Sequence, residues 1–592
     1  MDSFVEFNNG ANREVVNMKP VENQSCYQYW LDCTDMYGEY DAMQHFGKKI
    51  PKSRFLNDVD ALAAYARIEL GISRGDVVTV FMPTSIQSIA AFYAFNKIGV
   101  IVNFVHPLLP AEALKEAIEE GHSKAVMILD ILFMKYANPN SYIDVINEAG
   151  IPCIVCHSSD YGSFVKSTGT KGAEALIKKK MPAIKNREDY MAAVKRFSKA
   201  NVQPDCDPDE IAVFLNGGGT TGKSKTIMLT SRAINELACR VSKIDRIHQP
   251  GIEAEIIILP LFHCFGLCLA VHMAVCNGAR LIPLMQYDAA LVNRLMRDNK
   301  VIAMVGIPVM FKKLMDDKHF NPKYLKDWRM AFCGGDDAPE VWLDEFNKLL
   351  ENSGSPAKLR QGYGLTEVGS VCCHCSNWEF KPNSIGKPLD GVTMQIWDDD
   401  HHEVPVGEIG EMVISGPTIM SGYYHGDKSK LGDGLYTDEN GVKWVCSGDL
   451  GYRDEDGFFF FSGRKKRIII ISGYNVYPSD IEKKLTNDFP FVHEVCLAKG
   501  YRDGKQIIRM YVSLEGTEEE LTEATVEHYK ALMLDCIEKN FSKFSVPREI
   551  KVIPDLPHTP LEKVDFMKLT QNNPNDPEYV APPKKKESIL PV

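Results

Sequence analysis

The chain has 592 residues, a formal net charge of −12 at pH 7, and the composition of a soluble globular protein, with 45% hydrophobic and 25% charged residues. This length exceeds what one hydrophobic core normally organises, so we expect at least two domains. The net negative charge argues against a dedicated nucleic-acid binder.

The N-terminal segment MDSFVEFNNGANREVV has no basic region followed by a short apolar core, so it does not resemble a secretory signal. The C-terminal residues ILPV match neither a peroxisomal nor an endoplasmic-reticulum address. Without a secretory signal, the sixteen cysteines are expected to be reduced thiols. We therefore expect a cytoplasmic protein, with peripheral membrane contact left open.

Apolar segments with strand and helix character alternate from Asp76 onward. Strands are predicted at 77–81, 100–104 and 125–129, with helices from Ser85 to about Ile98 and at 111–120. Such alternation predicts parallel strands joined by crossover helices. The polar, Lys-rich segment 158–207 is predicted to be a surface excursion.

Residues 256–276 contain no Asp, Glu, Lys or Arg and are long enough to span a bilayer. Pro260 and Gly266 split this stretch, and it also carries His263 and His272. We favour a buried strand at 255–259, a short loop, and a buried helix from about Gly266. No integral membrane segment is therefore expected.

The pattern changes to short strands between Gly and Asp turns at residues 393–461, which predicts a small β-rich subdomain. A basic run, 464–467, precedes an apolar stretch at 468–471 and further βα-like segments that end near Leu569. The tail from Asn572 is rich in Pro and Lys and is predicted to be disordered.

The strongest single motif is GGGTTGKSKT, residues 217–226. Glycines let backbone N–H groups approach an anion, threonine hydroxyls add donors, and Lys223 adds positive charge, so the loop suits a polyphosphate. It also satisfies the literal P-loop pattern. A P-loop must open directly into a helix, whereas the β-branched segment 226–230 follows here, so we expect the loop to join two strands.

Five stretches, in order, resemble the motifs of the adenylate-forming superfamily, which includes acyl-CoA synthetases, luciferases and nonribosomal adenylation domains. They are the glycine-rich loop, LPLFHCFG (259–266), QGYGLTE (361–367), the long stretch 447–482 that begins SGDLGYRDEDG, and LPHTPLEKVDF (556–566). CGGDDAP, from Cys333, resembles a further segment of fatty-acyl-CoA synthetases. The likeness extends over about residues 50–570.

The resemblance implies roles for individual residues, with ATP, Mg²⁺ and coenzyme A as ligands. Tyr363 offers a ring on which adenine can stack, and Thr366 and Glu367 supply oxygen ligands for magnesium held with ATP. Asp449 and Arg464 would hold the ribose. The remaining nucleotide-site residues would be Gly218, Gly219, Thr220, Thr221, Gly222, Lys223, Gly335, Gln361, Gly362 and Gly364, with Thr221 as a second metal ligand.

Several of these residues could instead have purely structural roles. YGLTE could be a helix entry with Thr366 as the cap, and Asp449 could be a turn residue beside a solvated basic run. His263 is either a core histidine or, in the family, a catalytic-site residue beside the acyl pocket. Lys563 follows a proline-rich loop that would hold it extended, and it matches the family's catalytic C-terminal lysine.

In the family, a carboxylate attacks the α-phosphorus of ATP and releases pyrophosphate, and the thiol of coenzyme A then takes the acyl group. A small C-terminal domain turns about a hinge that maps to Lys466, and Ser472 and Gly473 would then line the pantetheine tunnel. The implied fold is α/β. It has a large N-terminal domain of βα subdomains with the β-rich subdomain (1–465), a small mobile α+β lid (466–570), and the tail (571–592).

Three other patterns resemble metal or haem motifs. CIVCH at 153–157 spells a haem-attachment motif, but it falls where a buried strand is expected. CCHC at 372–375 is too crowded for structural zinc, and we expect packing near the acyl pocket. DEDG at 454–457 is predicted to be a hairpin turn and not a calcium loop.

The chain departs from the family pattern at Gly217 and Gly218, where Ser is usual, at Thr226, where Gly is usual, and at Glu562, where Gly is usual. The Glu562 charge would raise the pKa of Lys563. We expect an acyl-CoA synthetase acting on a medium- or long-chain fatty acid. The alternatives are an aryl or amino-acid adenylating enzyme that delivers to a carrier protein, and a non-catalytic nucleotide-binding regulator.

Overall fold

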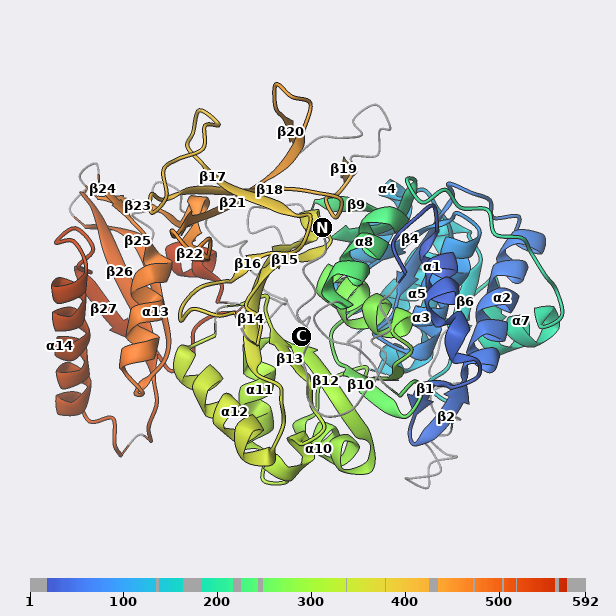
Figure 1. Ribbon diagram of the computed structural model, residues 1–592, viewed down its shortest axis with the longest axis horizontal. Coiled ribbons are helices and arrows are strands. Elements are labelled where there is room, and N and C mark those ends of the chain that lie inside the picture. Colours follow the sequence, from blue (N-terminus) through green and yellow to red (C-terminus); the bar gives the residue numbers. More distant parts are fainter. Residues whose placement is uncertain are drawn as a thin grey trace, which may run out of the picture. The chain divides into compact units, whose positions relative to one another are not determined.

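The computed structural model is a mixed α/β protein that divides into two compact units (Figure 1). The first comprises residues 1–215, 228–287 and 295–304, and the second 216–227, 288–294 and 305–592. The structure describes residues 19–134, 138–162, 183–216, 225–242, 249–336, 338–377, 379–424, 435–471, 474–502, 505–517, 519–558 and 564–571.

One sheet of the first unit confirms the predicted βα alternation. Its strands follow the order β9-β8-β4-β3-β5-β6-β7, and every neighbouring pair from β8 to β7 is parallel. The strands are β3 (Val77–Phe81), β4 (Ile101–Phe104), β5 (Ser123–Leu129), β6 (Cys153–Cys156), β7 (Arg187–Asp189), β8 (Ile211–Asn216) and β9 (Thr226–Thr230). The helices that connect or cover them are α3 (Ile86–Lys97), α4 (Ala111–Glu120), α5 (Pro139–Ala149), α7 (Tyr190–Phe197) and α8 (Ser231–Ser242).

Helix α3 is buried along its whole length, which explains its nearly uniform apolar sequence. Ser85 caps it as predicted, because the Ser85 side chain accepts a hydrogen bond from the Ser88 N–H and the Ser88 hydroxyl bonds back to the Ser85 N–H. Its Tyr93 packs against Trp30, with ring centroids 4.9 Å apart. Trp30 belongs to α1 (Cys26–Thr34) and also contacts Phe55 of α2 (Lys52–Ile68).

The second sheet of the first unit runs β12-β10-β11-β1-β2. Its strands are β1 (Asp41–His45), β2 (Lys48–Pro51), β10 (Glu253–Ile257), β11 (Arg280–Pro283) and β12 (Lys300–Gly306). A turn, the buried π-helix η4 (Phe265–Met273) and the short helix α9 (Ala274–Cys276) follow β10, so the strand–loop–helix prediction for this apolar stretch is confirmed. Among the described residues, no helix is both long and apolar enough to cross a bilayer.

The prediction that residues 158–207 form a surface excursion is wrong in part. Residues 187–189 form β7, which extends the sheet beside β6, and α7 follows at once. Tyr190 is fully buried, and its hydroxyl lies 2.9 Å from that of Tyr161. The polar residues that flank this strand and helix concealed both from a reading of hydrophobic pattern. Residues 163–182 lie outside the described part.

The second unit contains parallel β13 (Met330–Cys333) and β14 (Leu359–Leu365), followed by antiparallel β15 (Ser370–His374) and β16 (Lys387–Pro388). Its helices include α11 (Pro308–Asp316) and α12 (Glu340–Ser353), while α10 (Ala289–Asp298) begins in a segment of the second unit, 288–294, and ends in a segment of the first, 295–304.

The predicted β-rich segment forms an antiparallel sheet, β17-β18-β21-β20, with β22 paired to β21. These strands are β17 (Thr393–Trp397), β18 (Gly410–Ser415), β20 (Leu435–Thr437), β21 (Lys443–Arg453) and β22 (Phe459–Arg464), and β19 (Gly422–Tyr424) lies between β18 and β20 in sequence. DEDG forms the predicted turn between β21 and β22, where the Gly457 N–H donates to the Asp454 carbonyl over 3.1 Å.

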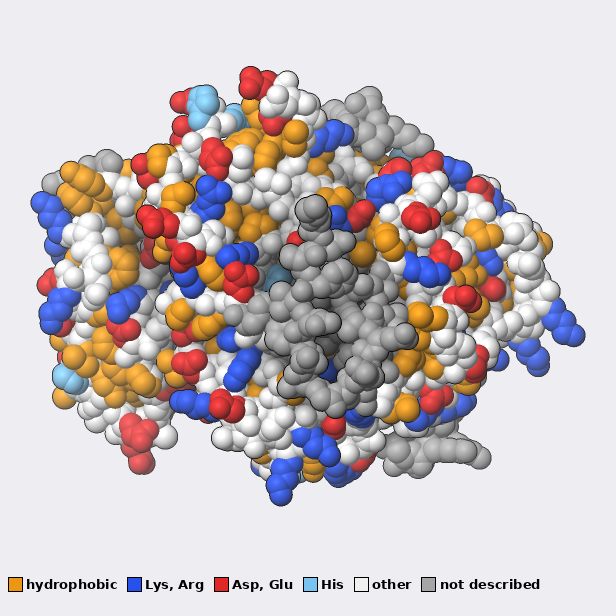
Figure 2. Space-filling model, in the orientation of Figure 1, with side chains coloured by type: hydrophobic (Ala, Val, Ile, Leu, Met, Phe, Trp, Pro, Cys, Tyr) orange, Lys and Arg blue, Asp and Glu red, His pale blue; other side chains and the backbone are white. Residues whose placement is uncertain are grey.

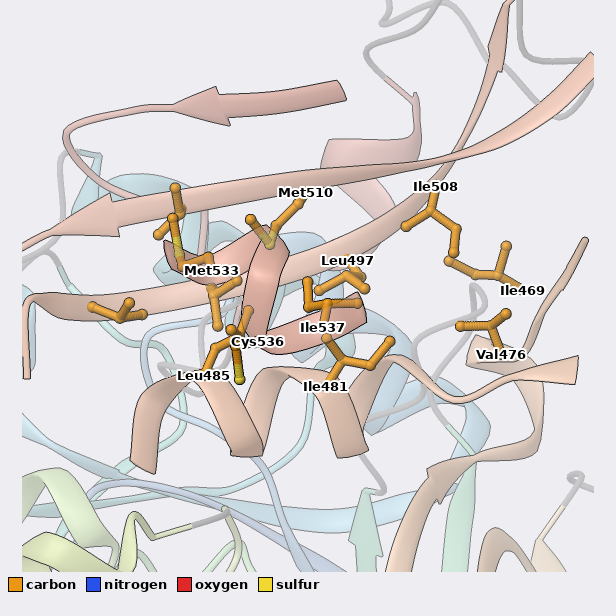
Figure 3. Close-up of a cluster of buried hydrophobic side chains, with 13 residues drawn as sticks. Ile469, Val476, Ile481, Leu485, Leu497, Ile508, Met510, Met533, Cys536 and Ile537 are labelled. Carbon is orange, nitrogen blue, oxygen red and sulfur yellow. The ribbon is translucent and has the colours of Figure 1, made fainter. Parts of the chain in front are cut away.

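The C-terminal region, from residue 469, contains hairpin β23 (Ile469–Ile471) and β24 (Tyr474–Val476) and the sheet β25-β26-β27. The sheet strands are β25 (Val492–Arg502), β26 (Lys505–Leu514) and β27 (Glu549–Val552), and the helices are α13 (Pro478–Asp488), α14 (Glu523–Asn540) and α15 (Phe566–Gln571). Figure 3 shows Ile481 and Leu485 of α13 and Ile537 of α14 meeting Leu497 and Met510 of the sheet, so the two helices cover the same face.

The other face of that sheet is also covered. Cys496 and Ala498, which alternate with Leu497 along β25, pack with Tyr511, Leu556 and Leu569. The C-terminal region therefore has an apolar core on each face of one sheet. On the molecular face that Figure 2 draws, described acidic and basic side chains are interspersed.

Candidate active site

The glycine-rich loop connects two strands, as the sequence predicted. It lies between β8 and β9, and a helix, α8, begins only at Ser231. Residues 217–224, which include Gly218, Gly219, Thr220, Thr221, Gly222 and Lys223, lie outside the described part. The ends of the loop are held together, because the Thr226 hydroxyl donates to Asn216 Oδ1 over 3.0 Å. The strand that follows is inconsistent with a P-loop, which opens into a helix.

The QGYG segment lies in β14, and its glycines are required by close packing. A Cβ added to Gly364 would lie 1.7 Å from the Ser370 carbonyl oxygen of β15, and one added to Gly362 would lie 2.1 Å from the Phe332 ring. Gln361 donates from its side-chain amide to the Ala338 carbonyl over 2.7 Å. These contacts fix the strand that carries Tyr363.

Tyr363, Asp449 and Arg464 come together. The Tyr363 hydroxyl donates to Asp449 Oδ2 over 2.8 Å, and Arg464 Nε lies 3.3 Å from Asp449 Oδ1. Asp449 of β21 and Arg464 of β22 are direct cross-strand partners. The Asp449 side chain is only 7% exposed, whereas Arg464 is about half exposed. Asp449 is thus a strand residue with a prearranged carboxylate, and the turn alternative is wrong.

Burial and the neighbouring Asp449 carboxylate raise the pKa of Tyr363 well above its ordinary value, so its hydroxyl remains a donor. The Tyr363 ring lies 6.3 Å from that of Phe461, at an interplanar angle of 36°. Each carboxylate oxygen of Asp449 can accept more than one hydrogen bond, so both can still accept from a sugar hydroxyl. This arrangement fits an aromatic base on the Tyr363 ring with its ribose beside Asp449.

Thr366 and Glu367 open a short 3-10 turn, η6 (Thr366–Val368). Leu365 is the N-cap and makes no side-chain cap bond, so the alternative of Thr366 as a helix cap is wrong. Glu367 Oε1 accepts a hydrogen bond from the Tyr423 hydroxyl over 2.9 Å, and the Glu367 carbonyl accepts one from the Met420 N–H over 2.8 Å. The carboxylate is held at one oxygen.

The donor set around Glu367 fits magnesium only when phosphates complete it. In the described part of the chain, no group of three or more His, Cys, Asp and Glu side chains could hold a metal ion by itself. Magnesium characteristically uses one or two carboxylates together with phosphates and water. Glu367, with the Thr366 and Thr221 hydroxyls of the prediction, is a donor set of that kind.

Two other predicted residues have known positions. Gly335 is exposed after β13 and has a φ of +83°, a backbone conformation that favours glycine. Lys466 is the exposed central residue of the 3-10 turn η8 (Lys465–Arg467), which links β22 to the C-terminal region. The next residue, Arg467, is anchored by Glu482 of α13 through contacts of 2.6 and 3.1 Å. The end of η8 is therefore fixed to helix α13 of the C-terminal region.

Lys563 lies outside the described part, as do Ser472 and Gly473. The ends of the Lys563 loop are nevertheless tied together. His558 and Val564 form an isolated antiparallel bridge, and the Asp565 N–H donates to the Pro557 carbonyl over 2.6 Å. The His558 ring lies 2.8 Å from Glu494 of β25, which fixes the base of this loop to the C-terminal sheet.

His263 belongs to the first unit and is half-buried in the turn before η4. Its Nδ1 accepts a hydrogen bond from the Phe265 N–H over 3.2 Å, which caps the first residue of the π-helix. This bond leaves Nε2 as the protonated ring nitrogen when the imidazole is neutral. His272, in contrast, is a satisfied core histidine, bonded to Tyr93 and Asn235 at 2.9 Å each. Burial lowers its pKa to about 3.

The cysteine-rich motifs are structural. Cys153–Cys156 is the buried strand β6, as predicted. The CCHC residues lie at the end of β15, where the Cys373 thiol contacts the Ile385 carbonyl at 3.3 Å and the Cys375 thiol contacts the Ser384 carbonyl at 3.5 Å. Burial raises the pKa of all five thiols of the two motifs. They behave as packed thiols.

Sequence reasoning missed Tyr423 and Lys225. Tyr423 bonds Glu367, and Lys225 Nζ lies 4.2 Å from the centroid of the Tyr423 ring. The only local signal is that Lys225 is the second lysine of the glycine-rich motif, while GYY at 422–424 carries no chemical signature of its own.

A nucleotide-binding α/β fold with this motif order defines a class of adenylate-forming enzymes. The family model for AMP-binding enzymes matches residues 36–424, so the chain belongs to the AMP-binding enzyme family.

Relatives and solved structures cover nearly the whole chain. A long-chain-fatty-acid–CoA ligase of Bacillus subtilis is 26% identical over 565 residues, covering 92% of this chain and 94% of that protein. ATP-bound MatB from Rhodopseudomonas palustris has a TM-score of 0.74 at 20% identity, covering 92% of this chain and 98% of its own. MenE, the o-succinylbenzoate–CoA synthetase of Bacillus subtilis, in complex with ATP and magnesium, has a TM-score of 0.70 at 20% identity, covering 93% and 100%. These structures confirm the fold.

Proposed function

We propose that this protein is an AMP-forming acyl-CoA ligase that activates a medium- or long-chain fatty acid with ATP and transfers the acyl group to coenzyme A. The observation that carries the proposal is the Tyr363–Asp449–Arg464 cluster, on the same unit as Glu367. The relatives named as long-chain-fatty-acid–CoA ligases support the acyl-CoA product and the fatty-acid substrate.

Adenylation is an attack by the substrate carboxylate on the α-phosphorus of ATP, which displaces pyrophosphate. Tyr363 would stack on adenine while Asp449 accepts from the ribose hydroxyls and Arg464 donates to the same sugar. Magnesium, when bound with ATP at Glu367, would neutralise phosphate charge. The loop amides and Lys563 would offset the repulsion between two anions, and losing one donor of this kind typically costs about a hundredfold to a thousandfold in rate.

Thiolation follows on the acyl-adenylate. The sulfur of coenzyme A attacks the acyl carbon, the carbon–sulfur bond forms, and AMP leaves. We propose that the C-terminal region turns about Lys466 between the two steps, so that Lys563 withdraws and Ser472 and Gly473 approach the pantetheine arm. The proposed lid is 466–570, and the larger N-terminal domain is 1–465.

Pyrophosphate exchange with a panel of acids tests this function. Exchange that depends on a fatty acid and is abolished in Lys563→Ala, while nucleotide binding persists, supports adenylation. Acyl product that forms with free coenzyme A, and not with a phosphopantetheinylated carrier protein, establishes the acceptor. Exchange that responds only to aryl or amino acids contradicts the fatty-acid assignment.

A further inference from the structure

We propose that Tyr423 is a positioning residue that orients the Glu367 carboxylate toward a divalent cation. This inference rests on the proposed function, because the cation would arrive with ATP. Tyr423 touches neither nucleotide nor metal in this scheme and acts only through Glu367.

Two contacts join Tyr423 and its segment to Glu367, and a third holds the Tyr423 ring. The Tyr423 hydroxyl donates to Glu367 Oε1 over 2.9 Å. The Met420 N–H, three residues before Tyr423, donates to the Glu367 carbonyl over 2.8 Å, so the backbones of the two segments are also tied. Lys225 Nζ lies 4.2 Å from the Tyr423 ring centroid, close enough for a cation–π interaction. The ring is thereby held on its face and at its hydroxyl.

The chemistry of this bond suits a positioning role. The Tyr423 hydroxyl donates its proton to a carboxylate oxygen, and a phenol has no second proton with which to bond the other oxygen. The bond occupies Oε1, and no described residue bonds Oε2. One carboxylate oxygen is therefore fixed by protein, while the other remains for a cation. Partners that orient a metal ligand typically contribute about tenfold to a hundredfold in metal affinity.

A structural role for Tyr423 would predict something different. If the tyrosine only packed β19 against its surroundings, loss of the hydroxyl would lower thermal stability or alter nucleotide binding without singling out the metal. A positioning role predicts that metal affinity changes while metal-free nucleotide affinity does not.

The test uses Tyr423→Phe in the full chain, because phenylalanine keeps the ring beneath Lys225 and removes only the hydroxyl. Free Mn²⁺ is measured by electron paramagnetic resonance during titration of the protein saturated with α,β-methylene-ATP. Nucleotide affinity is measured separately by calorimetry in EDTA. The matched control is Tyr436→Phe, since in the described part of the chain the Tyr436 hydroxyl has no hydrogen-bond partner and its ring stacks on His401.

We expect Mn²⁺ to bind about tenfold to a hundredfold more weakly to Tyr423→Phe than to the wild type, with nucleotide affinity in EDTA unchanged within about twofold. Tyr436→Phe should match the wild type in both measurements. Equal Mn²⁺ affinity in Tyr423→Phe and wild type overturns the inference. A loss of nucleotide affinity in EDTA as large as the loss of Mn²⁺ affinity also overturns it. A wild type that binds no Mn²⁺ with the nucleotide overturns the proposed function as well, so the two failures are distinguishable.

Discussion

Replacement of Asp449 by Asn tests the ribose site most sharply, because it keeps the shape of the side chain and removes its charge. Asp449 is only 7% exposed and contacts Tyr363 at 2.8 Å and Arg464 at 3.3 Å. Asn retains one oxygen acceptor, but its amide nitrogen is a donor and cannot accept a hydrogen bond from a second sugar hydroxyl.

A hydrogen bond to a charged group contributes about 1.5–3 kcal/mol, so the loss of one such bond to the nucleotide corresponds to about tenfold to 150-fold weaker binding. Calorimetric titration with AMP measures this directly for wild type and Asp449→Asn. The control is Asp400→Asn, which makes the same change of charge at an exposed position of the β-rich sheet's loops.

Tyr363→Phe extends the test, since it removes the hydroxyl that orients Asp449 and keeps the ring. If both residues serve one ribose site, the two substitutions should be non-additive in a double-mutant cycle, because removing either partner already breaks the shared bond. An unchanged affinity for AMP in Asp449→Asn, with an intact fold, would refute the assignment.

Three further outcomes follow from the structure. His157→Gln should lower the melting temperature more at pH 5.5 than at pH 8.5. The hydrogen bond from His157 to Asp130, 2.7 Å away, raises the pKa of His157 above 6.5. The stabilisation that protonated His157 gives the fold is therefore complete below about pH 6.5 and is lost as the pH rises through the raised pKa. An equal difference at both pH values would contradict this. Gly364→Ala should destabilise the protein by about 2 kcal/mol or more in urea unfolding, because its Cβ would meet the Ser370 carbonyl; an unchanged midpoint would refute the packing argument. Lys466→Pro should retain pyrophosphate exchange and lose acyl-CoA formation, measured in parallel, because it stiffens the proposed hinge; equal loss of both would contradict the hinge assignment.

Much of the fold was predictable from local sequence because local pattern and tertiary structure agree. The segments around α3 and α4 alternate strand and helix character, and Ser85 marks a helix start that the structure confirms. The strand after the glycine-rich loop was predictable because Thr226–Thr230 is β-branched and apolar. These features required no information from distant parts of the chain.

The missed elements are those whose burial depends on distant partners. Strand β7 consists of Arg187, Glu188 and Asp189, and only pairing with β6 makes it a strand. The π-helical form of η4 could not be predicted either, since a uniformly apolar segment has no periodicity to distinguish helix types.

Among the site residues, too, those with a local motif were predicted and those that depend on a distant partner were not. Asp449 and Arg464 were identified by their motif, and the structure brings them together with Tyr363. Tyr423 was missed because its partner, Glu367, is 56 residues away in sequence. A residue that acts through another ligand carries no motif of its own.

We propose that this chain joins a carboxylic acid to the α-phosphate of ATP. The most direct measurement is the exchange of labelled pyrophosphate into ATP, with magnesium, as single fatty acids are added. We predict exchange that requires both the acid and magnesium. Exchange that no acid stimulates, in protein that binds magnesium–ATP, would contradict the account.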